Sequence, residues 1–161
     1  MSEISITYDL LFDTLRIEKS REDIQKLDEK FYKNVVDYLN SKESAISNPN
    51  TPNAERELTK IQLGNVKKLL TELYDRREKK IINLAIYKIK TSAGVINTDV
   101  LLEEERHLFN TLYSKLSRYR STVLGNILEG RIPSIETPES EEQHHKQADV
   151  KMKESDDSEG V

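Results

Sequence analysis

The sequence contains no cysteine, and only five glycines and four prolines in 161 residues. Without cysteine the chain can form neither a disulfide framework nor a thiolate metal site. The five glycines are scattered, and none belongs to a phosphate-binding loop or a dinucleotide-binding fingerprint. These absences exclude disulfides, thiolate metal sites and the glycine-rich nucleotide-binding motifs.

Long apolar runs are also missing. No stretch approaches the roughly 20 apolar residues that a membrane-spanning helix needs. The first residues, Met1 to Ile4, lack the basic region and the apolar stretch of a signal peptide. We therefore expect a cytoplasmic protein that does not enter the membrane.

The net charge of −4 is unevenly distributed. Residues 133–161 hold nine acidic side chains and three lysines, a net charge of −6, so the remaining residues carry about +2. A nearly neutral folded part offers no large basic surface for nucleic acid. Hydrophobic residues make up 35% of the chain and charged residues 34%. This balance is typical of long helices with charged outer faces.

Apolar residues recur every three or four positions and predict helices. The predicted helices cover residues 8–19, 28–39, 54–89 and about 98–130. Asp28 is a plausible N-cap for the second, and either Thr98 or Asp99 for the last. Gly94 is suited to a left-handed cap after the third helix. The turn-forming residues of 43–53 predict a loop.

The predicted fold class is therefore all-α. We expect a bundle of four to five helices, one of them long, over residues 1–131. Residues 132–161 are predicted to be a disordered acidic tail, because they contain too little apolar surface to offset the entropy of ordering. No segment alternates with period two, so no β domain is expected.

No catalytic centre is predicted. His107 is the one histidine before the tail, and we expect it to be solvated on a helix. His144 and His145 lack the further ligands that a structural metal site requires. The acidic cluster at 103–105 is explained by a favourable interaction with the helix dipole. We therefore predict a protein that is not an enzyme and binds no cofactor and no metal.

The basic residues at 76–80 are interleaved with acids, which is typical of a solvated helix face. Arg77 and Lys80 differ from the rest because they border the apolar stripe of the long helix. We expect at least one of them to pair with a carboxylate. The candidates are Glu104 or Glu105 of the same chain, or an acid on a partner.

The two longest predicted helices carry more apolar surface than two short helices can cover. Part of that surface is expected to contact another protein, with aromatic residues as anchors. The candidate interface consists of Leu69, Leu73, Tyr74, Arg77, Lys80, Ile81, Leu84, Tyr113 and Tyr119. The chain is therefore predicted to dimerise or to join a larger complex, burying at least roughly 1,000 Å².

Three segments carry a family resemblance. Residues 72–85 read ELYDRREKKIINLA, residues 27–39 read LDEKFYKNVVDYL, and residues 102–120 read LEEERHLFNTLYSKLSRYR. In this order they resemble the patterns ELY..R..KI..LA, LP.DFY..V..YL and T.EE..LY..L...L..YR of archaeal-type GINS replication-complex subunits. The resemblance spans roughly residues 5–130 and is closest to the class with the helical domain first. Asp28 replaces the usual proline, Leu102 replaces a capping Thr or Ser, and the β domain expected after the helices is not visible.

The resemblance implies a non-catalytic subunit that joins a second GINS-type subunit in a hetero-oligomer such as a tetramer. It also implies that the complex binds and activates the replicative MCM helicase, binds a RecJ-like protein, and is associated with the nucleoid. Primase is a further candidate partner, and direct contact with DNA stays open. Two alternatives remain: a small all-helical enzyme resembling chorismate mutase, and a generic helical adaptor.

Overall fold

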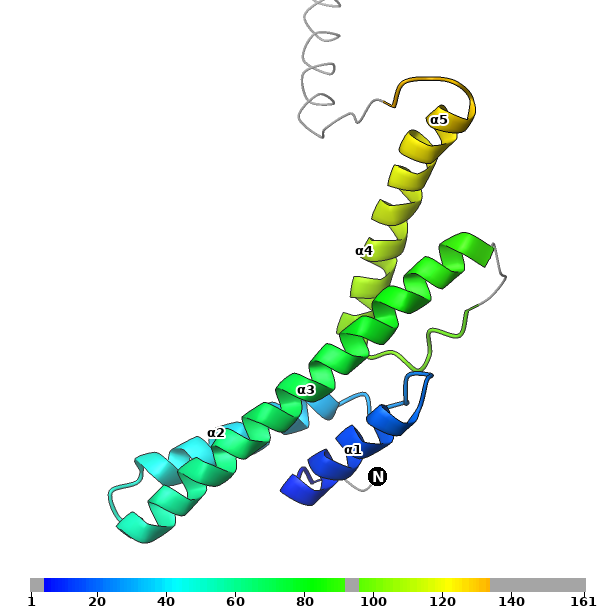
Figure 1. The fold of residues 1–161 in the computed structure, drawn as a ribbon. Helices are drawn as coiled ribbons and strands as arrows, with labels where there is room; N and C mark the ends of the chain where they lie inside the picture. Colours follow the sequence, from blue (N-terminus) through cyan, green and yellow to red (C-terminus); the bar gives the residue numbers. More distant parts are fainter. Residues whose placement is uncertain (1–4, 92–95, 134–161) are drawn as a thin grey trace, which may run out of the picture. The chain divides into compact units, whose positions relative to one another are not determined.

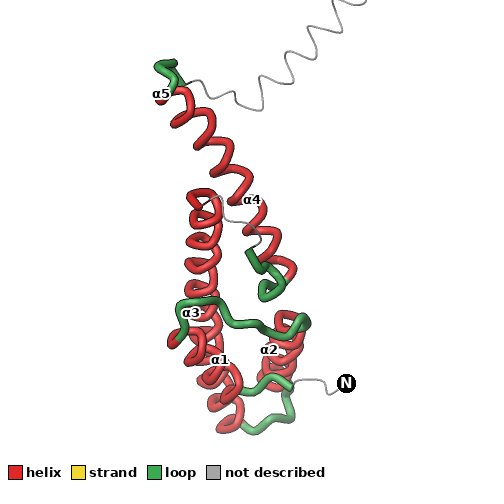
Figure 2. The backbone as a smooth tube through the Cα atoms, turned by 90° about the vertical axis from the view of Figure 1, so that its right-hand side faces the viewer, coloured by secondary structure: helices red, strands yellow, loops and turns green. Residues whose placement is uncertain are grey.

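A computed structural model describes residues 5–91 and 96–133 of the chain (Figure 1). The helices in chain order are α1 (Tyr8–Ser20), α2 (Phe31–Ser47), α3 (Asn53–Thr91), α4 (Glu103–Tyr119), the π-helix η1 (Arg120–Gly125) and α5 (Asn126–Leu128). The described part contains no strand, as Figure 2 shows, and the predicted all-α class is confirmed. Residues up to Ser114 form one compact unit, and the chain from Lys115 onward forms another. Each unit is described by itself.

Helix α1 begins where the sequence predicts and is capped by Thr7. The Thr7 hydroxyl accepts a hydrogen bond from the Leu10 amide at 3.1 Å, which satisfies one of the free donors of the first turn. Leu11 and Leu15, four residues apart, are buried and define the inner face of the helix.

Helix α2 differs from its predicted bounds at both ends. It begins at Phe31, because Asp28 forms a turn in which its carboxylate accepts from the Lys30 amide at 2.8 Å. Asp28 is therefore not the N-cap. The helix continues to Ser47, where a loop was predicted, and Ala45 and Ile46 are half-buried in its last turns.

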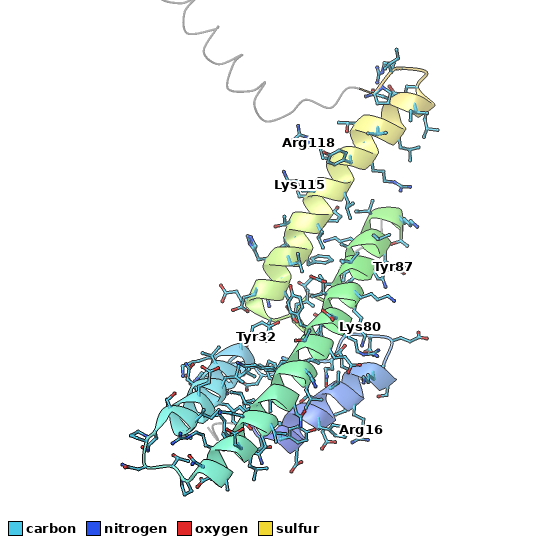
Figure 3. The ribbon with its side chains drawn as sticks, turned by 60° about the vertical axis from the view of Figure 1, so that its left-hand side comes forward. Arg16, Tyr32, Lys80, Tyr87, Lys115 and Arg118 are labelled. Atoms are coloured by element: carbon cyan, nitrogen blue, oxygen red, sulfur yellow. The ribbon has the colours of Figure 1, made fainter. Side chains whose placement is uncertain are left out.

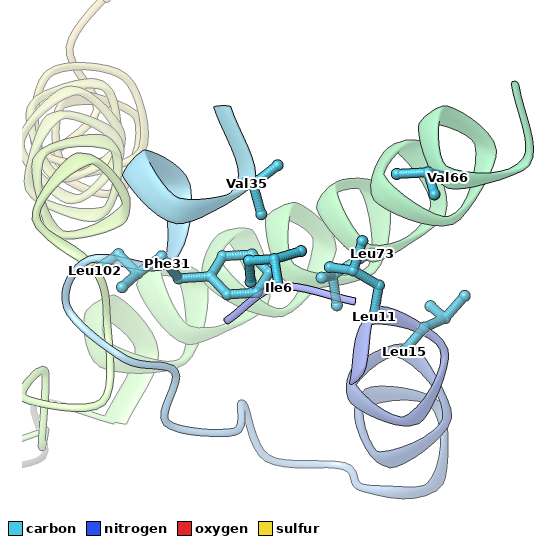
Figure 4. Packing of buried hydrophobic residues seen from close by; sticks show 8 residues of the cluster. All are labelled: Ile6, Leu11, Leu15, Phe31, Val35, Val66, Leu73 and Leu102. Atoms are coloured by element: carbon cyan, nitrogen blue, oxygen red, sulfur yellow. The ribbon is translucent and has the colours of Figure 1, made fainter. Parts of the chain in front are cut away.

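Helix α3 is the long helix that the sequence predicts. Its 39 residues span about 58 Å at 1.5 Å per residue. Helices α1 and α2 both pack against it. The shared core contains Ile6, Leu11, Leu15, Phe31, Val35, Val66, Leu73 and Leu102 (Figure 4). One long helix thus provides the surface on which the earlier helices assemble.

The start of α4 also corrects the sequence analysis. Residues Thr98 and Asp99 were predicted to start the helix, but they belong to turns that precede it, and α4 begins at Glu103. The turns place Leu101 and Leu102 in the core. A second buried cluster joins Ile24, Ile81, Ala85, Leu101 and Phe109.

The chain after Lys115 continues the helical path, but its hydrogen bonding changes. Residues Arg120–Gly125 form a π-helix instead of the predicted continuous α-helix. The side chain of Asn126 donates to the Thr122 carbonyl at 2.6 Å. Gly130 has φ of 71°, and the Arg131 amide bonds the Asn126 carbonyl at 2.8 Å. This Schellman motif ends the helix.

Gly64 gives the first testable prediction. It lies exposed in the interior of α3, and a Cβ added there would meet no heavy atom within 4 Å. Gly64→Ala should therefore raise the free energy of unfolding by about 0.5–1 kcal/mol, because alanine loses less backbone entropy in a helix. Urea denaturation measures the change. Gly130→Ala is the matched control and should destabilise, because alanine is strained at positive φ. A loss of stability in Gly64→Ala would contradict the prediction.

Two predictions fall on residues outside the described ranges. They are the cap at Gly94 and the disordered tail after residue 133. The division into a helical domain 1–131 and a tail 132–161 accordingly stays a prediction.

Candidate functional site

The most unusual feature of the helical core is an arginine on its apolar face. Arg77 lies four residues after Leu73 and four before Ile81, so helical periodicity directs all three side chains to one face. Both neighbours are buried, and Arg77 itself is only 2% exposed. A buried charge of this kind requires partners, because its removal from water is costly.

The first partner is Glu105 in the first turn of α4. The Arg77 Nε donates to Glu105 Oε1 at 2.6 Å, and its Nη2 donates to Oε2 at 2.7 Å. This two-pronged geometry is the strongest form of a charged hydrogen bond between side chains. Glu105 Oε2 also accepts from the Leu102 amide at 2.9 Å. The glutamate thus pairs with Arg77 and caps its own helix, as the N3 residue of a capping box does.

The second partner is Glu18 near the end of α1. Arg77 Nη1 donates to Glu18 Oε2 at 2.9 Å and to the Gln25 carbonyl at 2.8 Å. Lys80 pairs with Glu18 Oε1, and its Nζ also donates to the Glu18 carbonyl at 2.8 Å. We refer to Glu18, Arg77, Lys80 and Glu105 as the charge cluster. Its two positive and two negative charges cancel.

Polar neighbours complete the charge cluster. Gln25 donates from Nε2 to the Thr14 carbonyl at 2.6 Å, and the Tyr32 hydroxyl lies 3.4 Å from Glu105 Oε1. The cluster and these neighbours come from α1, the loop after it, α2, α3 and α4. The cluster therefore links these four helices of the described chain through charged and polar contacts.

Two pKa values respond to this environment. Burial acts to lower the pKa of Arg77, but the hydrogen bond and charge of Glu105, together with Glu18, outweigh it and raise the pKa. Burial, reinforced by the negative charge of Glu105, raises the pKa of Tyr32 to about 12. Both groups therefore keep their usual protonation state, a charged guanidinium and a neutral phenol, at neutral pH.

Tyr32 provides the second testable prediction. Its phenol should ionise near pH 12, above the ordinary value of 10. Because the folded pKa lies above the unfolded one, the stabilisation from neutral Tyr32 is complete below pH 10 and is lost as the pH rises toward 12. An ultraviolet titration of the wild type compared with Tyr32→Phe isolates this phenol. Ionisation near pH 10 would contradict the environment described here.

The prediction that at least one of Arg77 and Lys80 pairs with a carboxylate is confirmed. Arg77 pairs with Glu105, one of the candidate acids, while Lys80 pairs with Glu18, which was not among them. One signal could have found it. Glu18 follows Leu11 and Leu15 at the i+7 and i+3 positions, and so lies on the apolar face of α1. A charged residue on an apolar stripe indicates a buried partner. Gln25, in a loop, carries no comparable signal.

The structure separates the predicted interface residues into three groups. Leu73, Arg77 and Ile81 are buried within the chain; Leu69, Lys80, Leu84 and Tyr113 are partly buried; Tyr74 and Tyr119 are 52% and 49% exposed. Tyr113 stacks with Phe109, and the Lys88 Nζ lies 4.6 Å from the centre of its ring. Contact with a partner stays a prediction for all nine residues.

A hollow of about 510 Å³ lies beside the charge cluster. Its lining residues are Glu22, Asp23, Ile24, Lys80, Asn83, Leu84, Tyr87, Ile96, Asn97 and Val100. The ammonium of Lys80 already donates to Glu18 and to the Asp23 carbonyl. Its charge is therefore engaged within the chain.

Within residues 5–91 and 96–133, no three or more His, Asp or Glu side chains are placed to hold a metal ion. In the same ranges, no helix is both long enough and apolar enough to cross a membrane. His107 is exposed on α4, as predicted.

The long helix and the buried, electrically neutral charge cluster define a helical-bundle protein of structural type. A comparison with known protein families identifies the family. Residues 18–124 match the model of the GINS complex protein helical bundle domain, Sld5. The match covers more than half of the chain, and the chain belongs to this family of DNA replication proteins. No curated protein sequence matches the chain.

Proposed function

We propose that this protein is a non-catalytic subunit that joins a second GINS-type subunit in a hetero-oligomer. The match to the GINS helical bundle domain over residues 18–124 carries this proposal. The charge cluster supports it, because it links α1, α3 and α4 from within and leaves the outer faces available for partners. The charges of the cluster are satisfied within the chain, as a structural role requires.

The finer role follows from the family. In this proposal the complex acts within the cell at the nucleoid, where it binds and activates the replicative MCM helicase. A RecJ-like protein is a second partner, and primase is a third candidate. The part of the chain after Lys115 and the outer face of α3 provide the surfaces for assembly.

Among the predicted interface residues, Tyr74 and Tyr119 are the proposed anchors. Each is about half exposed, and tyrosine is enriched at the centres of interfaces because it buries a large area with few rotatable bonds. Leu73, Arg77 and Ile81 contribute indirectly, since they are buried on α3, the helix that presents Tyr74.

The enzyme alternative lacks a supporting observation. A site for a small dianionic substrate such as chorismate needs free cations that converge on one pocket. Arg77 is saturated by Glu105, Glu18 and the Gln25 carbonyl, and Lys80 is bound to Glu18. A substrate would have to displace these partners from the buried core.

Light scattering of the full-length chain, alone and mixed with the second GINS-type subunit of the same organism, tests the proposal. We expect a stable hetero-oligomer. Tyr74→Ser should weaken it, while Tyr87→Ser, at a similarly exposed tyrosine of the same helix, should not. Failure of the wild type to bind that subunit would overturn the proposal. Capture of purified MCM by the complex tests the finer role.

A further inference from the structure

The described residues after Lys115 expose a concentration of large apolar side chains. We call these six residues the terminal stripe: Leu116, Tyr119, Leu124, Ile127, Leu128 and Ile132. Their exposed fractions run from 37% for Leu116 to 92% for Ile132. Single exposed apolar residues are ordinary, but six within seventeen positions are a concentration of the kind that marks an interaction site.

The π-helix contributes to this surface. In an α-helix, positions three or four apart share a face, whereas i→i+5 bonding brings residues five apart into line. Tyr119 immediately precedes the π-helix, and Leu124, five residues later, lies within it. The turn therefore brings Leu124, and after it Leu128, toward the face of Leu116 and Tyr119. Short π-helical turns are frequent at functional sites.

The charge of the same segment is basic. Residues 115–133 contain Lys115, Arg118, Arg120 and Arg131 against a single acid, Glu129, for a net charge of +3. Arg131 pairs with Glu129, while Lys115 and Arg120 are both exposed along the helical part. Lys115 and Arg118 project from one side of α4 (Figure 3).

We propose that the terminal stripe docks against a helix of the second GINS-type subunit whose own apolar stripe is flanked by aspartate and glutamate. This inference rests on the proposed function. It adds which surface of this chain binds the second subunit and what chemistry the partner surface must have. Apolar side chains supply the buried contact, and the flanking cations supply attraction that steers association and fixes orientation.

The charges and the sequence argue against other occupants. A second copy of this chain would bring two +3 segments together, which is unfavourable. The chain's own residues 134–161 are acidic but contain only Ile135, Val150, Met152 and Val161 as large apolar residues. These four apolar side chains are too few to cover the six apolar side chains of the terminal stripe. Nucleic acid would satisfy the cations but leave Leu124, Ile127 and Leu128 without contacts.

The charge component is tested with the double substitution Lys115→Glu and Arg120→Glu in the full-length chain. Affinity for the second GINS-type subunit should fall about tenfold or more at low salt, mainly through slower association. The difference should shrink near 1 M salt, where the Debye length is about 3 Å. Lys79→Glu with Lys90→Glu makes the same charge change on exposed positions of α3 and should have little effect.

The apolar component is tested with Leu128→Ser. Because this side chain is 76% exposed, the substitution should leave the melting temperature unchanged while weakening binding about tenfold. Leu58→Ser, at a leucine that is 56% exposed on α3, is the matched control. Unchanged affinity in both the Leu128 and the charge variants, with the wild type still binding, would overturn this inference and leave the proposed function intact.

Each of the other possible occupants of the terminal stripe would give a different experimental result. Deletion of residues 134–161 that strengthens binding severalfold would show that the chain's own acidic segment occupies the stripe. A wild-type homodimer that Leu128→Ser dissociates would point to a second copy. Binding of a short DNA duplex that the double charge reversal abolishes would point to nucleic acid. Each of these results contradicts the proposal. A wild type that does not bind the second subunit would overturn the proposed function as well.

Discussion

Arg77→Ala should lower the free energy of unfolding by about 3–5 kcal/mol. The substitution leaves Glu105 without its two-pronged partner and Glu18 with Lys80 as its one charged partner, both in sites from which water is largely excluded. Removing one member of a buried ion pair costs this much because the remaining charge stays desolvated. Chemical denaturation followed by circular dichroism measures the loss.

Two comparisons make the Arg77 result specific. Lys79→Ala, at an exposed position two residues away, should change stability by no more than about 0.5 kcal/mol. Arg77→Met combined with Glu105→Met should cost less than the sum of the single changes, because the pair is removed together. Additive losses would indicate that the two side chains stabilise the protein independently, contrary to the geometry.

Phe109→Ala should also destabilise by about 3–5 kcal/mol. The ring is 1% exposed and packs with Ile81, Ala85 and Leu101, so its removal leaves a cavity between α3 and the start of α4. The ammonium of Lys88, 5.5 Å from the ring centre, also loses one of its two aromatic partners.

Conservative and exposed substitutions provide the controls for Phe109. Phe109→Leu retains most of the volume and should cost less than about 1.5 kcal/mol. Tyr119→Ala, at a half-exposed aromatic further along the same helix, should be nearly neutral in the isolated chain. A loss in Phe109→Ala no larger than that in Tyr119→Ala would show that the second cluster does not hold α4.

The sequence predicted which segments form helices, but it predicted the residues at which those helices begin and end less accurately. Periodic apolar residues report which face of a helix is buried, so the existence of α1 and the length of α3 were within reach. Caps depend on a few hydrogen bonds. Asp28 has the right chemistry for an N-cap but forms a turn two residues too early, and Leu102 has the wrong chemistry but precedes a glutamate that caps in its place.

Only the Arg77–Glu105 part of the charge cluster could be predicted from the sequence. The Glu18 part could not. Arg77 borders an apolar stripe, and acids begin the next helix, so its pairing with Glu105 could be predicted from local patterns. Glu18 lies 59 residues from Arg77 in sequence, and only the packing of α1 along α3 brings them together. The π-helical turn at Arg120–Gly125 was not predictable either, because its residues continue an ordinary helical pattern.

The arrangement of the charge cluster also has a consequence for protein synthesis. The chain emerges from the ribosome with Glu18 first, Arg77 and Lys80 next, and Glu105 last. A nascent chain that has completed α3 therefore has two cations for one carboxylate in its core, and its arginine lacks the partner with the best geometry. The bundle reaches electrical balance only when the first turn of α4 has been synthesised and Glu105 can pair with Arg77.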